Sequence, residues 1–249
     1  RTGWQVVIVD TDRYGQMDVT KIPGDPDAIC VVGLYGQSTN RTVWNRNWNS
    51  KQGVIEEGAQ HWLSDNSKRF CNTAISFDPM KNLNCYGNGG AIVTDDLDLL
   101  EFARAMRNNG KPKYEFAGSN SRMSEVDCAQ MLVKTRHLDK WQERRQDIAV
   151  YWVERLKKSG IRSLIDDNTV NGHAFHKFVI DVDNRDILAR NLAVKGIETR
   201  VHYKEPLHEL AAYTHYDAPD FLSVASSLSR RVLSLPIYPE LTDLEVEYI

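Results

Sequence analysis

Short apolar runs, separated by loops or by segments long enough for a helix, dominate the first part of the chain. These runs are residues 5–9, 29–34, 54–55, 73–77 and 91–94. They are rich in valine, isoleucine and threonine, as strands covered on both faces usually are. The pattern therefore predicts a buried, largely parallel sheet with helices on its faces.

After these apolar runs, the spacing of apolar residues becomes that of helices. Residues 96–108 carry apolar side chains at helical spacing, and Ser124 opens a second helical region with S-E-V-D. This sequence resembles a capping box, with aspartate in place of the usual glutamate or glutamine. The spacing predicts one long helix that continues towards Leu156 and ends near Gly160, because glycine readily adopts the left-handed conformation that stops helices.

The remainder of the chain has an α/β pattern of its own. Residues 176–182 alternate like a half-buried strand, residues 187–195 predict an amphipathic helix closed by Gly196, and residues 198–202 predict another strand. We therefore expect two domains, residues 1–140 and 141–249, with the boundary inside the long helix.

Composition narrows the functional classes. The chain has 31 basic and 34 acidic residues, a balance that gives no reason to expect a nucleic-acid partner. No stretch approaches the ~18 uninterrupted apolar residues of a membrane span, so no membrane partner is expected. No signal peptide precedes the first predicted strand. The four cysteines lack the spacing of metal ligands or of a redox pair, which favours reduced thiols in a cytoplasmic protein.

Lys81 is the first candidate for chemistry. It lies in an irregular loop between two predicted strands, within the sequence S-F-D-P-M-K-N-L-N-C-Y-G-N-G-G. A loop lysine usually reaches into solvent. The alternative is a lysine at a cavity wall, able to lose its proton and attack a carbonyl carbon. The spacing alone leaves both interpretations open.

Five segments resemble the DegT/DnrJ/StrS family of sugar aminotransferases. The first is S-F-D-P-M-K-N with N-G-G-A-I-V-T-D-D, which is similar to the cofactor-lysine segment of that family. The others are V-I-E-E-G-A-Q-H, G-S-N-S-R-M-S-E, G-I-E-T-R-V-H-Y-K-E-P-L-H and V-L-S-L-P-I-Y-P-E-L-T-D-L-E-V-E-Y. Each segment alone is a weak signal, but the five in order are specific. The resemblance implies an α/β protein of fold type I, with a mostly parallel sheet in a large domain, a smaller α/β C-terminal domain, and active sites at a homodimer interface.

The same resemblance implies pyridoxal phosphate as cofactor and a role for five residues. Lys81 matches the Schiff-base lysine, whose freed amine moves a proton during the reaction. Glu57 aligns with an aspartate that pairs with the protonated pyridine nitrogen; the longer side chain puts the position of the ring, or the strength of the site, in question. Gln60 matches a glutamine that contacts the phenolic oxygen. Ser76 matches a serine that binds the phosphate, and Asn120 an asparagine that reaches the neighbouring subunit's site.

Each of these residues also has a structural interpretation. Glu57 could face solvent at a strand end, Gln60 could be a polar residue at a helix start, and Ser76 could bond to backbone. Asn120 could be a turn residue. His202 and Tyr203 lie near the family's substrate region and are secondary candidates.

Three functions follow. The first is an aminotransferase that moves an amino group from an amino acid, with glutamate expected, to a nucleotide-linked keto sugar in polysaccharide biosynthesis. The second is a related deoxysugar dehydratase; those relatives carry histidine instead of the lysine, so Lys81 argues against it. The third is a non-catalytic regulatory protein that keeps the fold. The family's phosphate-binding turn and its ring-stacking aromatic residue have no counterpart between Arg1 and Asp10, so we expect an incomplete cofactor site.

Overall fold

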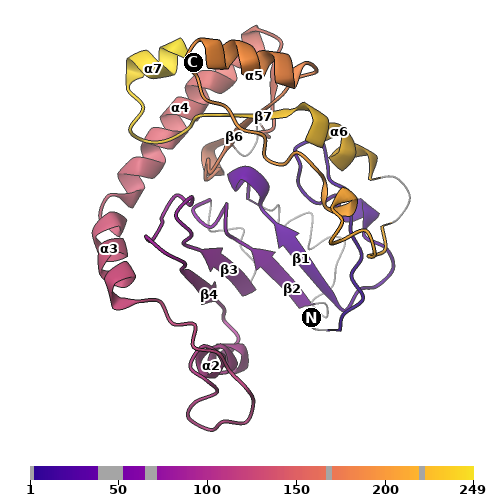
Figure 1. Ribbon diagram of the computed structural model, residues 1–249, viewed down its shortest axis with the longest axis vertical. Helices are drawn as coiled ribbons and strands as arrows, with labels where there is room; N and C mark the ends of the chain where they lie inside the picture. The colour runs from indigo at the N-terminus through magenta and orange to yellow at the C-terminus, as the bar shows by residue number, and fades with distance from the viewer. Residues whose placement is uncertain (1–2, 39–52, 65–71, 167–169, 219–221) are drawn as a thin grey trace.

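The computed structural model describes residues 3–38, 53–64, 72–166, 170–218 and 222–249. It contains a four-stranded sheet in the order β1-β2-β3-β4 and a three-stranded sheet in the order β5-β6-β7. Two consecutive helices, α3 and α4, run along one side of the molecule and lead from the first sheet to the second (Figure 1). No helix in the described part of the chain has the length and apolar character needed to cross a membrane.

The first sheet confirms the predicted, mostly parallel arrangement. Its strands are β1 (Ala28–Val32), β2 (Gly53–Glu57), β3 (Asn72–Ser76) and β4 (Gly90–Val93). The first three are parallel, and β4 runs antiparallel to β3. β4 is exposed along its whole length, and β1, β2 and β3 each carry at least one exposed residue, so the prediction of a buried sheet is wrong for much of this sheet. Burial depends on the elements that pack against each face, which the apolar runs do not specify.

The predicted strand at residues 5–9 is wrong. This segment makes one isolated bridge, between Val7 and Asp217, and the backbone N–H of Ile8 donates to the carbonyl of Asp217 at 2.9 Å. Residues 3–7 are exposed. An apolar run becomes a strand when a neighbouring chain pairs along its length, and Asp217 provides only a single point of pairing.

The long helix predicted from Ser124 is two helices, α3 (Glu125–Thr135) and α4 (Leu138–Lys158). The predicted start is confirmed, because the Ser124 hydroxyl accepts a hydrogen bond from the backbone N–H of Asp127. The predicted end is also confirmed, with Gly160 at a φ of 71°. Near the break the hydroxyl of Thr135 donates to the carbonyl of Leu132, a contact that bends helices.

The second sheet is antiparallel and packs against α4. The remaining elements are α2 (Leu97–Met106), β5 (Arg162–Ser163), β6 (Phe178–Asp181), α5 (Arg185–Val194), α6 (Ser223–Arg231), β7 (Val232–Leu235) and α7 (Asp243–Tyr248). Short 3-10 turns lie at Val19–Lys21, Leu34–Gly36, Val170–Gly172 and Leu207–Glu209. The domain boundary at residue 140 stays a prediction; α4 begins at Leu138.

Two strand predictions in this part need correction. All four residues of β6 are buried, although the sequence predicts alternation. Trp152 of α4 packs on Phe178 with ring centroids 5.1 Å apart, while Val179 packs in a cluster with Tyr35 and Leu228, so both faces are covered. Residues 198–202 form no strand and make only an isolated bridge between Arg200 and Ser234.

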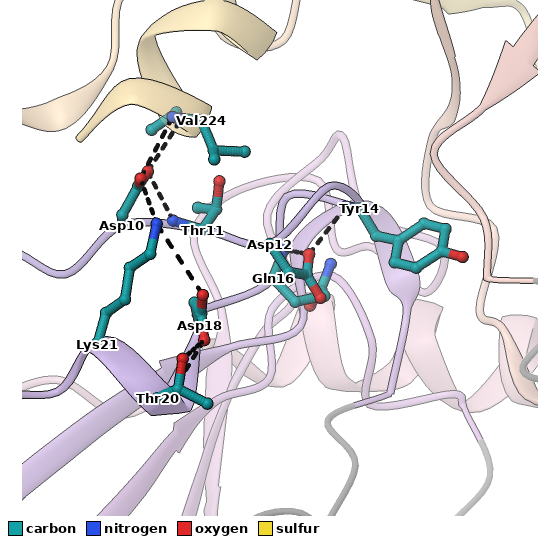
Figure 2. Close-up of polar contacts among 10 residues, drawn as sticks. Asp10, Thr11, Asp12, Tyr14, Gln16, Asp18, Thr20, Lys21 and Val224 are labelled. Carbon is teal, nitrogen blue, oxygen red and sulfur yellow. Dashed lines mark hydrogen bonds and ion pairs between the residues drawn. The ribbon is translucent and has the colours of Figure 1, made fainter. Parts of the chain in front are cut away.

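Asp10 connects the N-terminal segment to helix α6 (Figure 2). Its buried carboxylate accepts hydrogen bonds from the backbone N–H groups of Val224 at 3.2 Å and Ala225 at 2.9 Å, and from the Lys21 ammonium at 2.9 Å. Burial opposes ionisation, but these hydrogen bonds outweigh it and hold the pKa of Asp10 below its usual value. Asp10 therefore caps a helix from a distant part of the sequence.

We expect Asp10→Ala to lower the free energy of unfolding by about 2–4 kcal/mol, because it leaves helix N–H groups and Lys21 without their acceptor. Asp18→Ala is the matched control; that carboxylate caps a short exposed turn at Thr20, and about 1 kcal/mol or less is expected. Urea unfolding at neutral pH measures both. The pKa of Asp10 is lowered in the folded state. Its contribution to the free energy of unfolding should therefore shrink as the pH falls through that pKa. Equal effects at the two positions would contradict the capping role.

Candidate active site

The carboxyl ends of strands β2 and β3 bring together four of the five predicted site residues. Glu57 ends β2 and Gln60 lies in the turn after it, while Ser76 ends β3 and Lys81 lies in the turn after that strand. The two strands are adjacent and parallel. Their carboxyl ends therefore meet at one edge of the sheet, where ligands of open α/β sheets bind.

Hydrogen bonds shape the turn that carries Lys81. The backbone N–H of Lys81 donates to the carbonyl of Asp78 at 2.9 Å, and the Asp78 carboxylate accepts from the backbone N–H of Met80 at 2.9 Å. The Ser76 hydroxyl accepts from the backbone N–H of Asp78 at 3.2 Å. Ser76 thus bonds to backbone, as its structural interpretation expects, and its hydroxyl hydrogen stays available for a further acceptor.

Asn82 fixes the position of the Lys81 turn relative to the C-terminal part. Its side-chain amide nitrogen donates to the carbonyl of Ala174 at 2.7 Å, and its amide oxygen lies 3.3 Å from Nδ1 of His176. The residue next to Lys81 is therefore bonded to the segment that leads into β6. Asn82 was not among the site residues predicted from sequence, although it stands directly after Lys81 in the motif S-F-D-P-M-K-N.

Glu57 and Gln60 line a cavity of about 420 Å³ together with Tyr35 and Tyr203. The Glu57 carboxylate accepts from the backbone N–H of Ala59 at 3.0 Å. The buried Gln60 side chain accepts from the backbone N–H of Tyr35 at 2.7 Å and donates to the Tyr203 hydroxyl at 3.0 Å. Lys81 is not one of the residues that line this cavity.

Tyr35 is a cavity residue that sequence analysis missed. It follows β1 with a φ of 65°, and its hydroxyl donates to the carbonyl of His202. Burial raises its pKa above the usual value, so the hydroxyl stays protonated. The Gln16 side chain holds the preceding turn by exchanging hydrogen bonds with the backbone N–H and carbonyl of Leu34, at 3.2 and 3.1 Å. The sequence feature that could have indicated Tyr35 is L-Y-G, a turn sequence directly after a strand.

The secondary candidates His202 and Tyr203 lie at different cavities. Tyr203 is bonded to Gln60 at the 420 Å³ cavity. His202 lines a second cavity, where its Nδ1 is 2.8 Å from the Ser234 hydroxyl. Burial, together with the nearby charges of Lys177 and Arg200, lowers the pKa of His202 to about 4, which keeps its ring neutral at neutral pH.

The adjacent glutamates of β2 have different surroundings. Glu56 is fully buried, with one carboxylate oxygen 2.8 Å from Nε2 of His61 and the other accepting from the Thr73 hydroxyl at 2.9 Å. Glu57 points the other way, into the cavity wall. Strand geometry explains the difference, because consecutive side chains point to opposite faces.

Asn120 lies apart from the other four residues. It is exposed and forms an isolated bridge with Asn108, beside the end of helix α2. The neighbouring Ser119 donates its backbone N–H to the carbonyl of Met106 at 2.7 Å. The structure therefore does not bring Asn120 to the edge where Glu57 and Lys81 lie.

Residues 1–249 match the DegT/DnrJ/EryC1/StrS aminotransferase family. The chain belongs to this family. The match confirms the family predicted from the five sequence segments, and every part of the sequence discussed above falls inside it.

Two relatives show how much of a family member the chain represents. It is 41% identical over 180 residues to the erythromycin biosynthesis sensory transduction protein EryC1 of Saccharopolyspora erythraea, covering 71% of this chain and 49% of that protein. It is 37% identical over 242 residues to the dTDP-3-amino-3,6-dideoxy-alpha-D-galactopyranose transaminase of Aneurinibacillus thermoaerophilus, covering 92% of this chain and 65% of that protein. The chain thus spans about half to two thirds of their length.

A solved structure confirms the fold class. The chain is similar to NtdA from Bacillus subtilis with bound cofactor PMP, with 27% sequence identity and a TM-score of 0.81. The similarity covers 96% of this chain and 59% of that one. The predicted fold type I architecture of the family is therefore confirmed.

The residues at the shared strand edge fit the cofactor of this family. Pyridoxal phosphate requires an amine for its aldehyde and a carboxylate for its protonated ring nitrogen. Lys81 has no carboxylate partner among the described residues, and Glu57 faces a cavity. Gln60 has a second amide hydrogen, and Ser76 a hydroxyl hydrogen, to donate to oxygens of the cofactor.

Proposed function

We propose that this chain is part of an enzyme that transfers an amino group from an amino acid to a nucleotide-linked keto sugar, with pyridoxal phosphate as cofactor. One observation carries the proposal: Lys81 and Glu57, in motifs of an aminotransferase family, lie at the ends of adjacent parallel strands. The Aneurinibacillus relative, named a transaminase of a dTDP-linked sugar, supports a nucleotide sugar as acceptor. Glutamate is the expected donor.

Pyridoxal phosphate, when bound, supplies an electron sink for negative charge at the reacting carbon. Lys81 would hold the cofactor through its aldehyde, and its amine would carry the proton that leaves the donor's Cα. Glu57 would keep a proton on the pyridine nitrogen through its negative charge. Gln60 and Ser76 would bind the phenolic oxygen and the phosphate, and thereby orient the ring.

The test follows the transferred nitrogen. The purified protein is incubated with pyridoxal phosphate, ¹⁵N-glutamate and a panel of dTDP- and UDP-linked keto sugars. We expect ¹⁵N in an amino-sugar product detected by mass spectrometry. Loss of sugar hydroxyl without nitrogen incorporation would favour the dehydratase. No visible cofactor absorbance and no turnover would favour the regulatory alternative, which the name of the EryC1 relative keeps relevant.

Homodimer formation, with Asn120 serving the partner's site, and a cytoplasmic location belong to the same proposal. Asn120 is exposed and separate from its own Lys81 turn, which supports a role across an interface.

Two inactive variants, Lys81→Ala and Asn120→Ala, are expected to recover part of the activity after subunit exchange, because one site of the mixed dimer then carries neither change. Activity is measured before and after mixing, with exchange verified by differently tagged subunits. Lys113→Ala mixed with Lys81→Ala is the control for dilution, since Lys113 lies in an exposed loop. Proven exchange without recovery would place Asn120 outside the partner's site.

A further inference from the structure

A second cavity, of about 470 Å³, lies in the C-terminal part of the chain. Its polar wall is formed by His176, Lys177, Arg200, His202 and Ser234. His176 connects it to the lysine turn, because its Nδ1 is 3.3 Å from the amide oxygen of Asn82. One wall residue of this cavity is therefore hydrogen-bonded to the residue that follows Lys81, and the charge of Lys81 is near enough to Lys177 to act on its pKa.

Lys177 is a half-buried cation without a carboxylate partner among the described residues. Its position is fixed by the backbone, since its N–H donates to the carbonyl of Tyr35 at 3.0 Å. Burial and the charges of Lys81 and Arg145 lower the pKa of Lys177 below its usual value. A cation withdrawn from water and surrounded by like charges is unfavourable unless an anion joins it.

Arg145, whose charge acts on Lys177, adds a positive charge near the cavity. Arg145 donates to the carbonyls of Phe175 at 3.2 Å and Ile237 at 2.7 Å, and burial lowers its pKa to about 10 even though the charge of Glu240 acts in the opposite direction. The ring of His176 is neutral, because burial and the nearby Lys177, Lys81, Arg145 and His202 lower its pKa. The cavity thus offers one ammonium beside neutral imidazoles.

Charge counting selects the type of anion. Arg200 is already paired with Glu198, and Glu245, also on the wall, accepts hydrogen bonds from Thr242 at the start of α7. Among the cations on the described wall of this cavity, Lys177 is left without a carboxylate partner, so one carboxylate of the ligand balances it. A diphosphate would bring several negative charges towards the two glutamates. The apolar wall at Leu235 and Ile237 suits the aliphatic chain of an amino acid.

We propose that Lys177, with His176 and His202 beside it, binds a carboxylate of the amino-acid donor and directs the donor towards Lys81. The inference rests on the proposed function, because it assigns the cavity to one of that reaction's two substrates. The residues that bind the donor in this inference differ from those proposed to hold the cofactor.

The test is calorimetric titration of the purified protein with glutarate, a dicarboxylate that has no amino or keto group to react. Lys177→Met is expected to weaken binding about tenfold or more, and Lys177→Arg by about threefold or less, since arginine keeps the charge. Lys113→Met, in an exposed loop, should bind like the unchanged protein. Thermal unfolding of each variant checks its fold; if Lys177→Met is unfolded, Lys177→Gln takes its place.

Two further ligands distinguish the source of the anion. Titrations with UDP and with inorganic phosphate should be unchanged by Lys177→Met. The inference is overturned if Lys177→Met binds glutarate as tightly as the unchanged protein does. It is also overturned if Lys177→Met weakens the binding of UDP or phosphate and leaves glutarate binding unaffected. In the enzyme assay, Lys177→Met should raise the KM for glutamate about tenfold and leave the KM for the keto sugar unchanged. Glutarate binding needs no turnover, so the titration tests the Lys177 site even if no sugar is aminated. The absence of aminated sugar would then contradict the proposed function and not the binding site.

Discussion

Lys81→Ala is expected to abolish covalent retention of pyridoxal phosphate and to lower transamination about 10⁴-fold. The change removes both the amine that binds the cofactor aldehyde and the group that carries the Cα proton, and loss of a nucleophile or of a general base has effects of this size. Borohydride reduction followed by peptide mass spectrometry measures the first effect. In the unchanged protein the cofactor mass should appear on the peptide that contains Lys81.

Two lysines make this test selective. Lys113, in an exposed loop, is the matched control, and Lys113→Ala should keep both the label and the activity. Lys177, whose pKa is lowered by burial and by the nearby charge of Lys81, is the alternative amine. A label found on Lys177 would show that the sequence motif identified the wrong nucleophile.

Replacing the two glutamates of β2 is expected to separate activity from stability. Glu57→Gln keeps the shape of the side chain but removes its charge, and should lower turnover about a hundredfold, because the pyridine nitrogen loses its electrostatic partner. Its effect on unfolding should be small, since Glu57 lies at a cavity wall. Glu57→Asp keeps the charge and should retain most of the activity.

Glu56→Ala should act mainly on the fold. It removes the acceptor of the buried His61 and Thr73 side chains, and breaking a buried charged network costs about 3–5 kcal/mol. Urea unfolding at neutral pH, run beside the activity assay, measures both quantities for both positions. A stable, inactive Glu56 variant together with an active Glu57→Gln variant would mean that Glu56 is the carboxylate of the active site.

The amino-acid sequence by itself determined the elements whose stabilisation is local. The apolar runs at 29–34 and 73–77 became β1 and β3, and Ser124 and Gly160 delimit the helical region as predicted. The positions of Glu57 at the end of its strand and of Lys81 after its strand also follow from sequence, because the carboxyl ends of parallel strands meet at one sheet edge. Caps, glycine conformations and short strand runs depend on neighbours along the chain.

Only the tertiary structure decided which faces of these elements are covered. Alternation in the sequence predicted a half-buried β6, but Trp152 and Tyr35, from distant segments of the chain, cover both of its faces. The run at residues 5–9 makes only an isolated bridge in the described structure. Asp10 caps helix α6, which lies far along the chain. The Lys177 cavity likewise joins segments that no spacing connects. A pattern of apolar positions reports how a segment prefers to fold, whereas burial and pairing depend on contacts between segments distant in sequence.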